Sequence, residues 1–431
     1  MGNLRPSHEW AVFAKLRPRA TLAAKEDAVS RGGIEGLQVH GEVAERFEGV
    51  REEFERNFAE RGELGAACCA YLDGEKVVDL WGGLRDRRTG ALWEEDTLVL
   101  VFSTTKGMSA LAVALAHSRG LIDYDETVAA YWPEFAHNGK GDITVRQLLN
   151  HRAGLCAVAE PLNPRVLSDL DRVAGILARQ RPAWEPGKRQ GYHYLTLGLC
   201  ENELIRRVDP LGRSLGRFLS EEIVAPLGEE FHVGLPPELP ASRVATVEAF
   251  HPLQMLLHVN TLPLGLVLGY MNPRSLTART LGNPKLRSPG DLDRPEYRRV
   301  ELGAAGGIGT ARAIAKVYGV FATGGGDLGV GPKTIEELET PVAPPPAGSR
   351  DEVLKTDTSY SLGFFKPSPA FRFGTDERSF GTPGAGGSFG FADPTAGVGF
   401  AYAPNKMGFH VWDDPREKAL REALYACLNG R

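Results

Sequence analysis

The sequence predicts an α+β protein in which both ends of the chain build one domain around a mainly helical middle. Strand-like apolar runs occur within residues 1–103 and return after about residue 387. Between them, from about residue 104 to 295, apolar side chains recur at three- and four-residue steps and strand patterns are scarce. We therefore expect an α/β domain made of residues 1–103 and 296–431, a mainly helical domain of residues 104–295, and an active site in the cleft between them.

Length and charge narrow the class of protein. The 431 residues exceed the size at which one hydrophobic core usually keeps growing. The net charge is −5 and no run of Lys or Arg stands out, so nucleic acid is not an expected partner. The most apolar long stretch, residues 252–271, is interrupted by His258, Asn260 and Pro263, so we expect no membrane span. A homo-oligomer is compatible with these properties.

The N-terminus and the cysteines favour the cytoplasm. Residues 1–20 are polar and lack the apolar region of a secretory signal, and Pro6 stands where a myristoylation site requires Ser or Thr. The cysteines show no CxxC spacing and most lie in apolar segments, so we expect free thiols, no zinc site and no other metal or cofactor. They are Cys68, Cys69, Cys156, Cys200 and Cys427.

Helix and turn signals follow one another along the N-terminal third. Residues 42–61 carry apolar side chains at helical spacing and predict an amphipathic helix. Two apolar runs then flank Asp73-Gly74, which is typical of a hairpin. From residue 104 to 118 nearly all side chains are small or apolar, so this helix is expected to be buried, with Gly120 as its stop.

Later elements are marked mainly by helix caps. Thr144 and Thr310 each precede a helical pattern, and Asp414-Pro415 has the N-cap and first-turn proline of a last helix. A further helix is expected over residues 195–208. Residues 252–271 either line one wall of the site or form a buried core helix. Strands are expected at residues 387–392 and 397–403.

Ser103 and Lys106 form the only Ser-x-x-Lys in the chain and lie where the buried helix begins. At this spacing both side chains share one face of the first turn. There the unpaired N–H groups favour negative charge, and a partly buried lysine can accept a proton. The alternative is a serine N-cap beside a solvated lysine, because such a pattern arises by chance about once in a chain this long.

Tyr192 precedes the expected helix 195–208, where a tyrosine can point into a cleft. A lysine ammonium beside it would favour the phenolate, which could take the Ser103 proton and return it to the leaving alcohol. The alternative is an aromatic ring packed under the loop. A third segment, residues 382–388, is rich in glycine and allows a backbone to approach a ligand closely, as an oxyanion hole requires.

Four segments together resemble the family VIII carboxylesterases: STTKG at 103–107, HRAGL at 151–155, GYHYLTLG at 191–198 and FGTPGAGGSFGFADP at 380–394. The resemblance covers most of residues 40–430. It implies a β-lactamase/transpeptidase-like fold, with an antiparallel sheet flanked by helices plus a mainly helical domain. The implied function is a serine hydrolase that cleaves short-chain carboxylic esters through an acyl-enzyme.

The same resemblance assigns roles to individual residues. Ser103 would be the nucleophile, Lys106 its partner and Tyr192 the general base of acylation. The oxyanion hole would comprise the N–H groups of Ser103 and Ala385. The residues expected to bind substrate are Tyr194, Thr382, Gly384 and Gly386.

Two departures argue against efficient β-lactam hydrolysis. Tyr194 stands where the related β-lactamases carry Asn, and Thr382 stands where the third motif opens with Lys or, in many esterases, His. Lys355-Thr356 does not replace that motif, because Asp357 stands in place of the glycine and no glycine-rich strand follows directly. The alternatives are a β-lactamase, a D-aminopeptidase or transpeptidase-like acyl transfer, and a non-catalytic binding protein on the same fold.

Other motifs are interpreted as incidental. Ser388 lies in a G-x-S-x-G sequence, but a strand pattern follows where a nucleophile elbow needs a helix. The stretch from Gly306 lacks the third glycine of a dinucleotide site, so no nicotinamide cofactor is indicated. His151 and His193 lack metal-ligand spacing and are expected to form hydrogen bonds within their loops.

Overall fold

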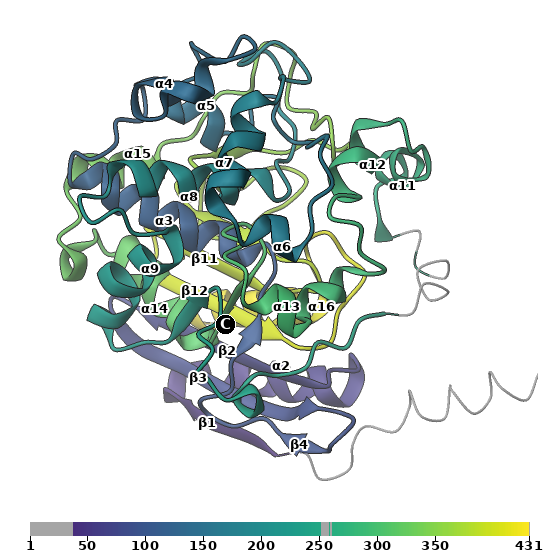
Figure 1. Ribbon diagram of the computed structural model, residues 1–431. Coiled ribbons are helices and arrows are strands. Elements are labelled where there is room, and N and C mark those ends of the chain that lie inside the picture. Colours follow the sequence, from purple (N-terminus) through teal and green to yellow (C-terminus); the bar gives the residue numbers. More distant parts are fainter. Residues whose placement is uncertain (1–37, 251–257, 259–260, 431) are drawn as a thin grey trace, which may run out of the picture.

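A computed structural model describes residues 38–250, 258 and 261–430 (Figure 1). Its nine-stranded sheet has the order β1-β3-β2-β12-β11-β10-β9-β8, with β4 paired to β3, and every neighbouring pair is antiparallel. Strands from both ends of the chain therefore meet in one sheet, β2 beside β12. The strands are β1 (Val39–Val43), β2 (Gly65–Leu72), β3 (Glu75–Asp86), β4 (Ala91–Leu92), β8 (Tyr360–Ser361), β9 (Phe364–Phe365), β10 (Phe380–Pro383), β11 (Phe389–Asp393) and β12 (Val398–Pro404).

The two faces of this sheet differ in side-chain size. Along β12, Phe400 and Tyr402 pack in one cluster with the apolar side chains of α2 (Glu48–Glu60) and α16 (Pro415–Leu428). Between them, Gly399 and Ala401 face α14 (Ala311–Ala322). A Cβ on Gly399 would lie 2.2 Å from the Gly319 nitrogen, so α14 can approach only because this face carries so little side chain. The sheet is thus covered by α14 on one face and by α2 and α16 on the other.

Helices from the middle of the chain lie beyond the sheet, coloured blue to green in Figure 1. Helix α3 (Thr104–Ser118) is their centre: nearly all of it is buried, and it contacts α8, α9 and β10. A small second sheet has the order β5-β7-β6, from β5 (Val99–Leu100), β7 (Gly307–Gly309) and β6 (Phe231–Val233). The remaining helices are α4 (Val128–Tyr131), α5 (Val145–Leu149), α6 (Pro164–Leu167), α7 (Leu170–Arg179), α8 (Thr196–Val208), α9 (Leu215–Leu219), α11 (Leu264–Met271), α12 (Leu276–Leu281), α13 (Pro295–Arg298) and α15 (Pro332–Glu339).

Most expected elements form, and their caps are those expected. Thr144 and Gln147 make a reciprocal capping box at α5, and the Thr310 side chain caps α14. The Asp414 side chain accepts from the first turn of α16. Asp73 and Gly74 both have positive φ, as the tight turn between β2 and β3 requires.

The prediction of a helix over residues 42–61 is wrong in its first part. Residues up to Val43 belong to β1, which pairs with β3 in the register Val43 to Val78, and the helix starts only at Glu48. The edge of β3 offers backbone hydrogen bonds to this segment, and tertiary pairing overrides helical spacing there.

Helix α11 also differs from one of the two expectations for residues 252–271. Residues 251–257 and 259–260 lie outside the described chain, but α11 leaves several large apolar side chains exposed, so a buried core helix is wrong for this part. The exposed side chains are Leu264, Leu268, Tyr270 and Met271. Over the described residues, no helix combines the length and the hydropathy needed to cross a bilayer.

Candidate active site

Ser103 lies at the N-terminal end of α3, directly after a residue with an unusual backbone conformation. Phe102 has a φ of 47°, in the left-handed region that costs energy for a residue with a side chain. The strands before it fix this bend, because β5 pairs with β7 and the Val101 N–H donates to the Gly307 carbonyl at 2.9 Å. Ser103 is thereby held on the first turn of a buried helix with 8% of its surface exposed.

The structure brings Ser103, Lys106 and Tyr192 together. The Tyr192 hydroxyl donates to Ser103 Oγ at 2.7 Å, and Lys106 Nζ donates to the same oxygen at 3.3 Å. Two further bonds from Lys106 Nζ reach the carbonyls of Tyr194 at 2.7 Å and Ala304 at 2.8 Å. One serine oxygen therefore contacts two groups that can move a proton, within hydrogen-bond reach of each.

The glycine-rich turn between β10 and β11 lies against the loop that carries the serine. A Cβ on Gly384 would lie 2.4 Å from the Val101 carbonyl, so only glycine permits this approach. Ala385 follows and is exposed. Over residues 38–250, 258 and 261–430, the N–H groups of Ser103 and Ala385 have no hydrogen-bond acceptor, which leaves both free for a substrate oxygen.

A sequence model of the family described as Beta-lactamase matches residues 50–425. The chain belongs to the beta-lactamase family. It is 32% identical over 381 residues to the esterase/beta-lactamase LipL of Mycobacterium tuberculosis, covering 86% of this chain and 84% of that protein.

Solved structures agree with this family membership. A family VIII carboxylesterase is 35% identical with a TM-score of 0.79, covering 90% of this chain and 100% of that one. A penicillin-binding protein homologue from Caulobacter crescentus is 37% identical with a TM-score of 0.77, at the same coverage. The predicted β-lactamase/transpeptidase-like fold is confirmed.

Burial changes the proton affinities of this beta-lactamase-family site. Lys106 has no exposed surface, and burial lowers its pKa to about 7, with the charge of Glu201 acting in the opposite direction. Burial raises the pKa of Tyr192 above its ordinary value, although the hydrogen bond with Ser103 opposes this. Burial therefore opposes the Tyr192 phenolate that is expected from the sequence, and the role of Tyr192 as a base stays a prediction.

Glu201 is a buried acid that sequence reasoning missed. It lies on α8 with no exposed surface, and neither carboxylate oxygen has a hydrogen-bond partner among the described residues. Burial raises its pKa to about 8, and the Lys106 charge opposes this. One signal was available: Glu201 falls four residues after Leu197 and three before Leu204, on the apolar face of the expected helix.

The four expected substrate-binding residues lie around the turn in different ways. Tyr194 is partly buried, with its ring 5.9 Å from Lys106 Nζ. Thr382 has no exposed surface and packs beside Gly107 of α3, so any effect on substrate would run through β10. Gly384 fits under the Ser103 loop, and Gly386 directs its carbonyl away to Arg416.

Ser388 is built into the support of this turn. It precedes β11, so the helix that a nucleophile elbow needs does not follow it, as predicted. Its hydroxyl donates to the Val101 carbonyl at 2.7 Å and lies 3.1 Å from Thr104 Oγ1. This buried hydroxyl therefore links the turn to the start of α3.

The two histidines near the site form structural hydrogen bonds, but these bonds join the two loops, whereas hydrogen bonds within each loop are expected from the sequence. His151 Nδ1 accepts from the His193 N–H at 3.0 Å, and His193 Nε2 accepts from the Leu155 N–H at 3.0 Å. Burial lowers the pKa of His193 to about 4 and that of His151 well below its ordinary value. Both rings are thus neutral supports of the Tyr192 loop near pH 7.

In the described part of the chain, no cluster of three or more His, Cys, Asp or Glu residues could hold a metal ion.

Proposed function

We propose that this protein hydrolyses short-chain carboxylic esters through an acyl-enzyme on Ser103. The observation that carries the proposal is the contact of one buried serine oxygen with both the Tyr192 hydroxyl and Lys106 Nζ. Relatives named esterase/beta-lactamase and family VIII carboxylesterase support a serine hydrolase acting on esters.

Acylation begins when Lys106 is neutral, above about pH 7: its two N–H groups then donate to the Tyr194 and Ala304 carbonyls, and Nζ accepts the proton of Ser103. Ser103 Oγ attacks the ester carbonyl carbon, and the N–H groups of Ser103 and Ala385 bind the resulting oxyanion. When the intermediate collapses, Tyr192 gives its proton to the leaving alcohol oxygen and recovers one from Lys106. This assigns Lys106 the role of base and Tyr192 that of acid.

Deacylation uses the same groups in reverse. Lys106 takes a proton from water through Tyr192, the hydroxide attacks the acyl carbon, and the same N–H groups bind the second oxyanion. Collapse releases the carboxylic acid and returns the proton to Ser103 Oγ. No metal or cofactor is needed for either step.

Neutral esters are the proposed substrates in preference to β-lactams. A β-lactam carries a carboxylate, and position 382 provides a buried threonine where a related enzyme has a cation. Desolvating that carboxylate without a charged partner costs binding free energy. The intact trio of Ser103, Lys106 and Tyr192 counts against a non-catalytic binding protein.

The test is hydrolysis of a panel of p-nitrophenyl esters, a chromogenic cephalosporin and a D-amino-acid peptide, with Ser103→Ala as control. We expect ester hydrolysis that Ser103→Ala abolishes. If the wild type cleaves the cephalosporin or the peptide more efficiently than every ester, the proposed substrate class is wrong.

As for the location of the protein in the cell, the five free thiols favour a reducing compartment, and we propose the cytoplasm.

A further inference from the structure

We infer that Arg416 is a positioning residue that fixes the oxyanion turn, residues 384–388, through the Gly386 carbonyl. The inference rests on the proposed function, since it gives Ala385 of this turn a place in the oxyanion hole. Arg416 itself lies on α16, and among the described residues its guanidinium donates to the Gly386 carbonyl of the turn and not to Ser103 or Ala385.

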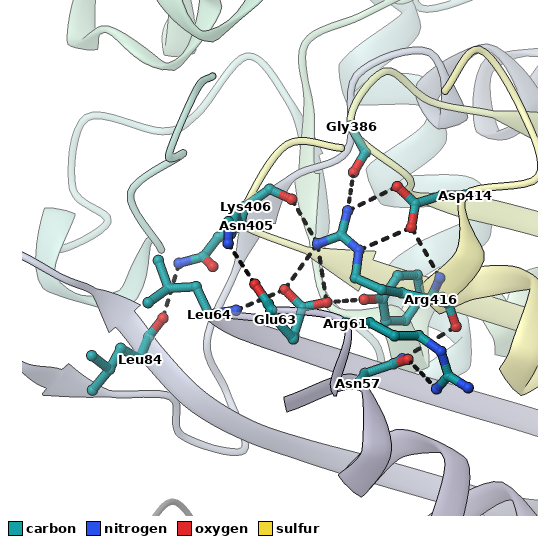
Figure 2. Close-up of polar contacts among 12 residues, drawn as sticks. Asn57, Arg61, Glu63, Leu64, Leu84, Gly386, Asn405, Lys406, Asp414 and Arg416 are labelled. Carbon is teal, nitrogen blue, oxygen red and sulfur yellow. Dashed lines mark hydrogen bonds and ion pairs between the residues drawn. The ribbon is translucent and has the colours of Figure 1, made fainter. Parts of the chain in front are cut away.

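Arg416 has all five of its N–H groups engaged, as Figure 2 shows. Nη2 donates to the Gly386 carbonyl at 2.8 Å and to Asp414 Oδ2 at 3.0 Å. Nε donates to Asp414 Oδ1 at 2.9 Å, and Nη1 donates to Glu63 at 3.1 Å and to the Lys406 carbonyl at 2.9 Å. The guanidinium can therefore adopt only one orientation, with Nη2 aimed at the turn.

The carboxylates that hold Arg416 are themselves buried. The side chain of Glu63 has no exposed surface, that of Asp414 is 4% exposed, and that of Arg416 is 6% exposed. Glu63 also accepts a hydrogen bond from the Tyr402 hydroxyl on β12. Breaking one member of a buried ion cluster is costly, so this cluster gives the Gly386 carbonyl a rigid partner.

The turn needs such an outside partner because it has little side chain of its own. Gly386 and Gly387 have φ of 90° and 106°, which suits glycine alone and leaves the backbone free to move. Gly384, before Ala385, is held by its N–H bond to the Ser388 carbonyl at 2.7 Å. Gly386, after Ala385, is held by Arg416 and by the Gly408 N–H at 3.0 Å. The free N–H of Ala385 is thus fixed from both sides.

This arrangement predicts a loss in kcat rather than in substrate binding. An oxyanion donor that is misplaced weakens the transition state more than the bound ester. Losing such a donor outright costs ~10²–10³ in kcat, and a displaced donor should cost roughly ten- to a hundredfold. A purely structural role would lower stability and leave the rate per folded molecule unchanged.

The experiment compares Arg416→Lys with Arg421→Lys, a matched control on the same helix. Arg421 is also buried and bonded to carboxylates, Glu417 and Asp413, but makes no bond to the turn. Both variants are assayed with p-nitrophenyl butyrate after circular dichroism confirms folding. Affinity for phenylboronic acid, which forms a tetrahedral adduct with a serine, is measured as a second readout.

For Arg416→Lys we expect kcat to fall roughly ten- to a hundredfold with KM within about twofold, and boronate affinity to fall with kcat. Arg421→Lys should keep the wild-type kcat. If Arg416→Lys does not fold, Asp414→Asn serves instead: asparagine keeps the cap of α16 but weakens the hold on Nη2, so a smaller fall in kcat is expected.

A folded Arg416→Lys or Asp414→Asn with unchanged kcat and boronate affinity would overturn the inference, as would an equal loss in Arg421→Lys. Failure of the proposed function looks different: the wild type would hydrolyse no ester, or Ser103→Ala would hydrolyse it equally well, and the inference would then fall with it.

Discussion

Replacing Glu201 by glutamine should move the pH dependence of hydrolysis to lower pH. Lys106 acts as base only when neutral, and burial places its pKa at about 7 while the charge of Glu201 opposes that effect. Burial raises the pKa of Glu201 to about 8, so its carboxyl group is only partly ionised where Lys106 titrates, and removing that fraction of negative charge lowers the Lys106 pKa by a small amount. Because the neutral form is the active one, activity is present above this pKa and is lost as pH falls below it.

The rise of kcat/KM with pH in the wild type follows from the same Lys106 pKa. A base with a pKa of about 7 is roughly a tenth neutral at about pH 6 and nine-tenths neutral at about pH 8, so kcat/KM should rise about tenfold and then level off. A lysine at its ordinary 10.5 would give a rate that still climbs above pH 8. In Glu201→Gln the plateau should extend to lower pH.

Apart from Glu201, whose pKa of about 8 falls in the same pH window, the groups near Lys106 do not account for this rise in rate. Burial lowers the pKa of His193 to about 4, lowers that of His151 well below its ordinary value, and raises that of Tyr192. The matched control is Glu203→Gln on the same helix, because Glu203 is also buried but pairs with Arg206 and Arg207.

The assay is kcat/KM for p-nitrophenyl butyrate from about pH 5 to pH 9, corrected for spontaneous hydrolysis. We expect Glu203→Gln to keep the wild-type midpoint. A wild-type rate that falls with rising pH would show that the ammonium form is the active one. An unmoved midpoint in folded Glu201→Gln would refute the coupling between Glu201 and Lys106.

Three further outcomes are expected. Tyr192→Phe should lower kcat by ~10²–10⁴ with the fold intact by circular dichroism, because the leaving alcohol loses its proton donor; a near-wild-type rate would show that Lys106 alone moves the proton. The wild type should have a kcat/KM at least ~100-fold higher for p-nitrophenyl butyrate than for a chromogenic cephalosporin. A tenfold difference corresponds to about 1.4 kcal/mol, and burying the cephalosporin carboxylate without a charged partner costs more free energy than that. Equal values would show that another cation replaces the one missing at Thr382. Phe400→Ala should lower the free energy of unfolding by about 3–5 kcal/mol in urea titrations, because the ring is fully buried between the sheet and α2 with α16; a loss under about 1 kcal/mol would contradict that packing.

Local signals in the sequence were sufficient for elements whose stability is decided nearby. The capped helices α5, α14 and α16 and the Asp73-Gly74 hairpin depend on contacts within a few residues, and all were predicted. The start of α2 was not, because residues 39–43 gain hydrogen bonds from β3, some forty residues away. Only tertiary pairing decides between strand and helix there.

The residues of the site likewise divide into those that local signals in the sequence mark and those that only the tertiary structure brings together. Ser103 and Lys106 share one helical turn and could be paired from spacing, and Tyr192 could be added by resemblance to a family. Arg416 could not be found, because its partner Glu63 is 353 residues away and no motif marks either residue. The effect of burial on Tyr192 was also beyond the sequence, since desolvation depends on the whole of the surrounding packing.

The central claim is that Ser103 forms the acyl-enzyme, and covalent labelling tests it most directly. The wild type, Ser103→Ala and Ser388→Ala would each be treated with diethyl p-nitrophenyl phosphate, which phosphorylates activated serines, and the labelled peptide identified by mass spectrometry. We expect one label on the peptide containing Ser103 in the wild type and in Ser388→Ala, and none in Ser103→Ala, with ester hydrolysis lost in parallel. A label on Ser388, or an Ser103→Ala protein that is still labelled and active, would contradict the account.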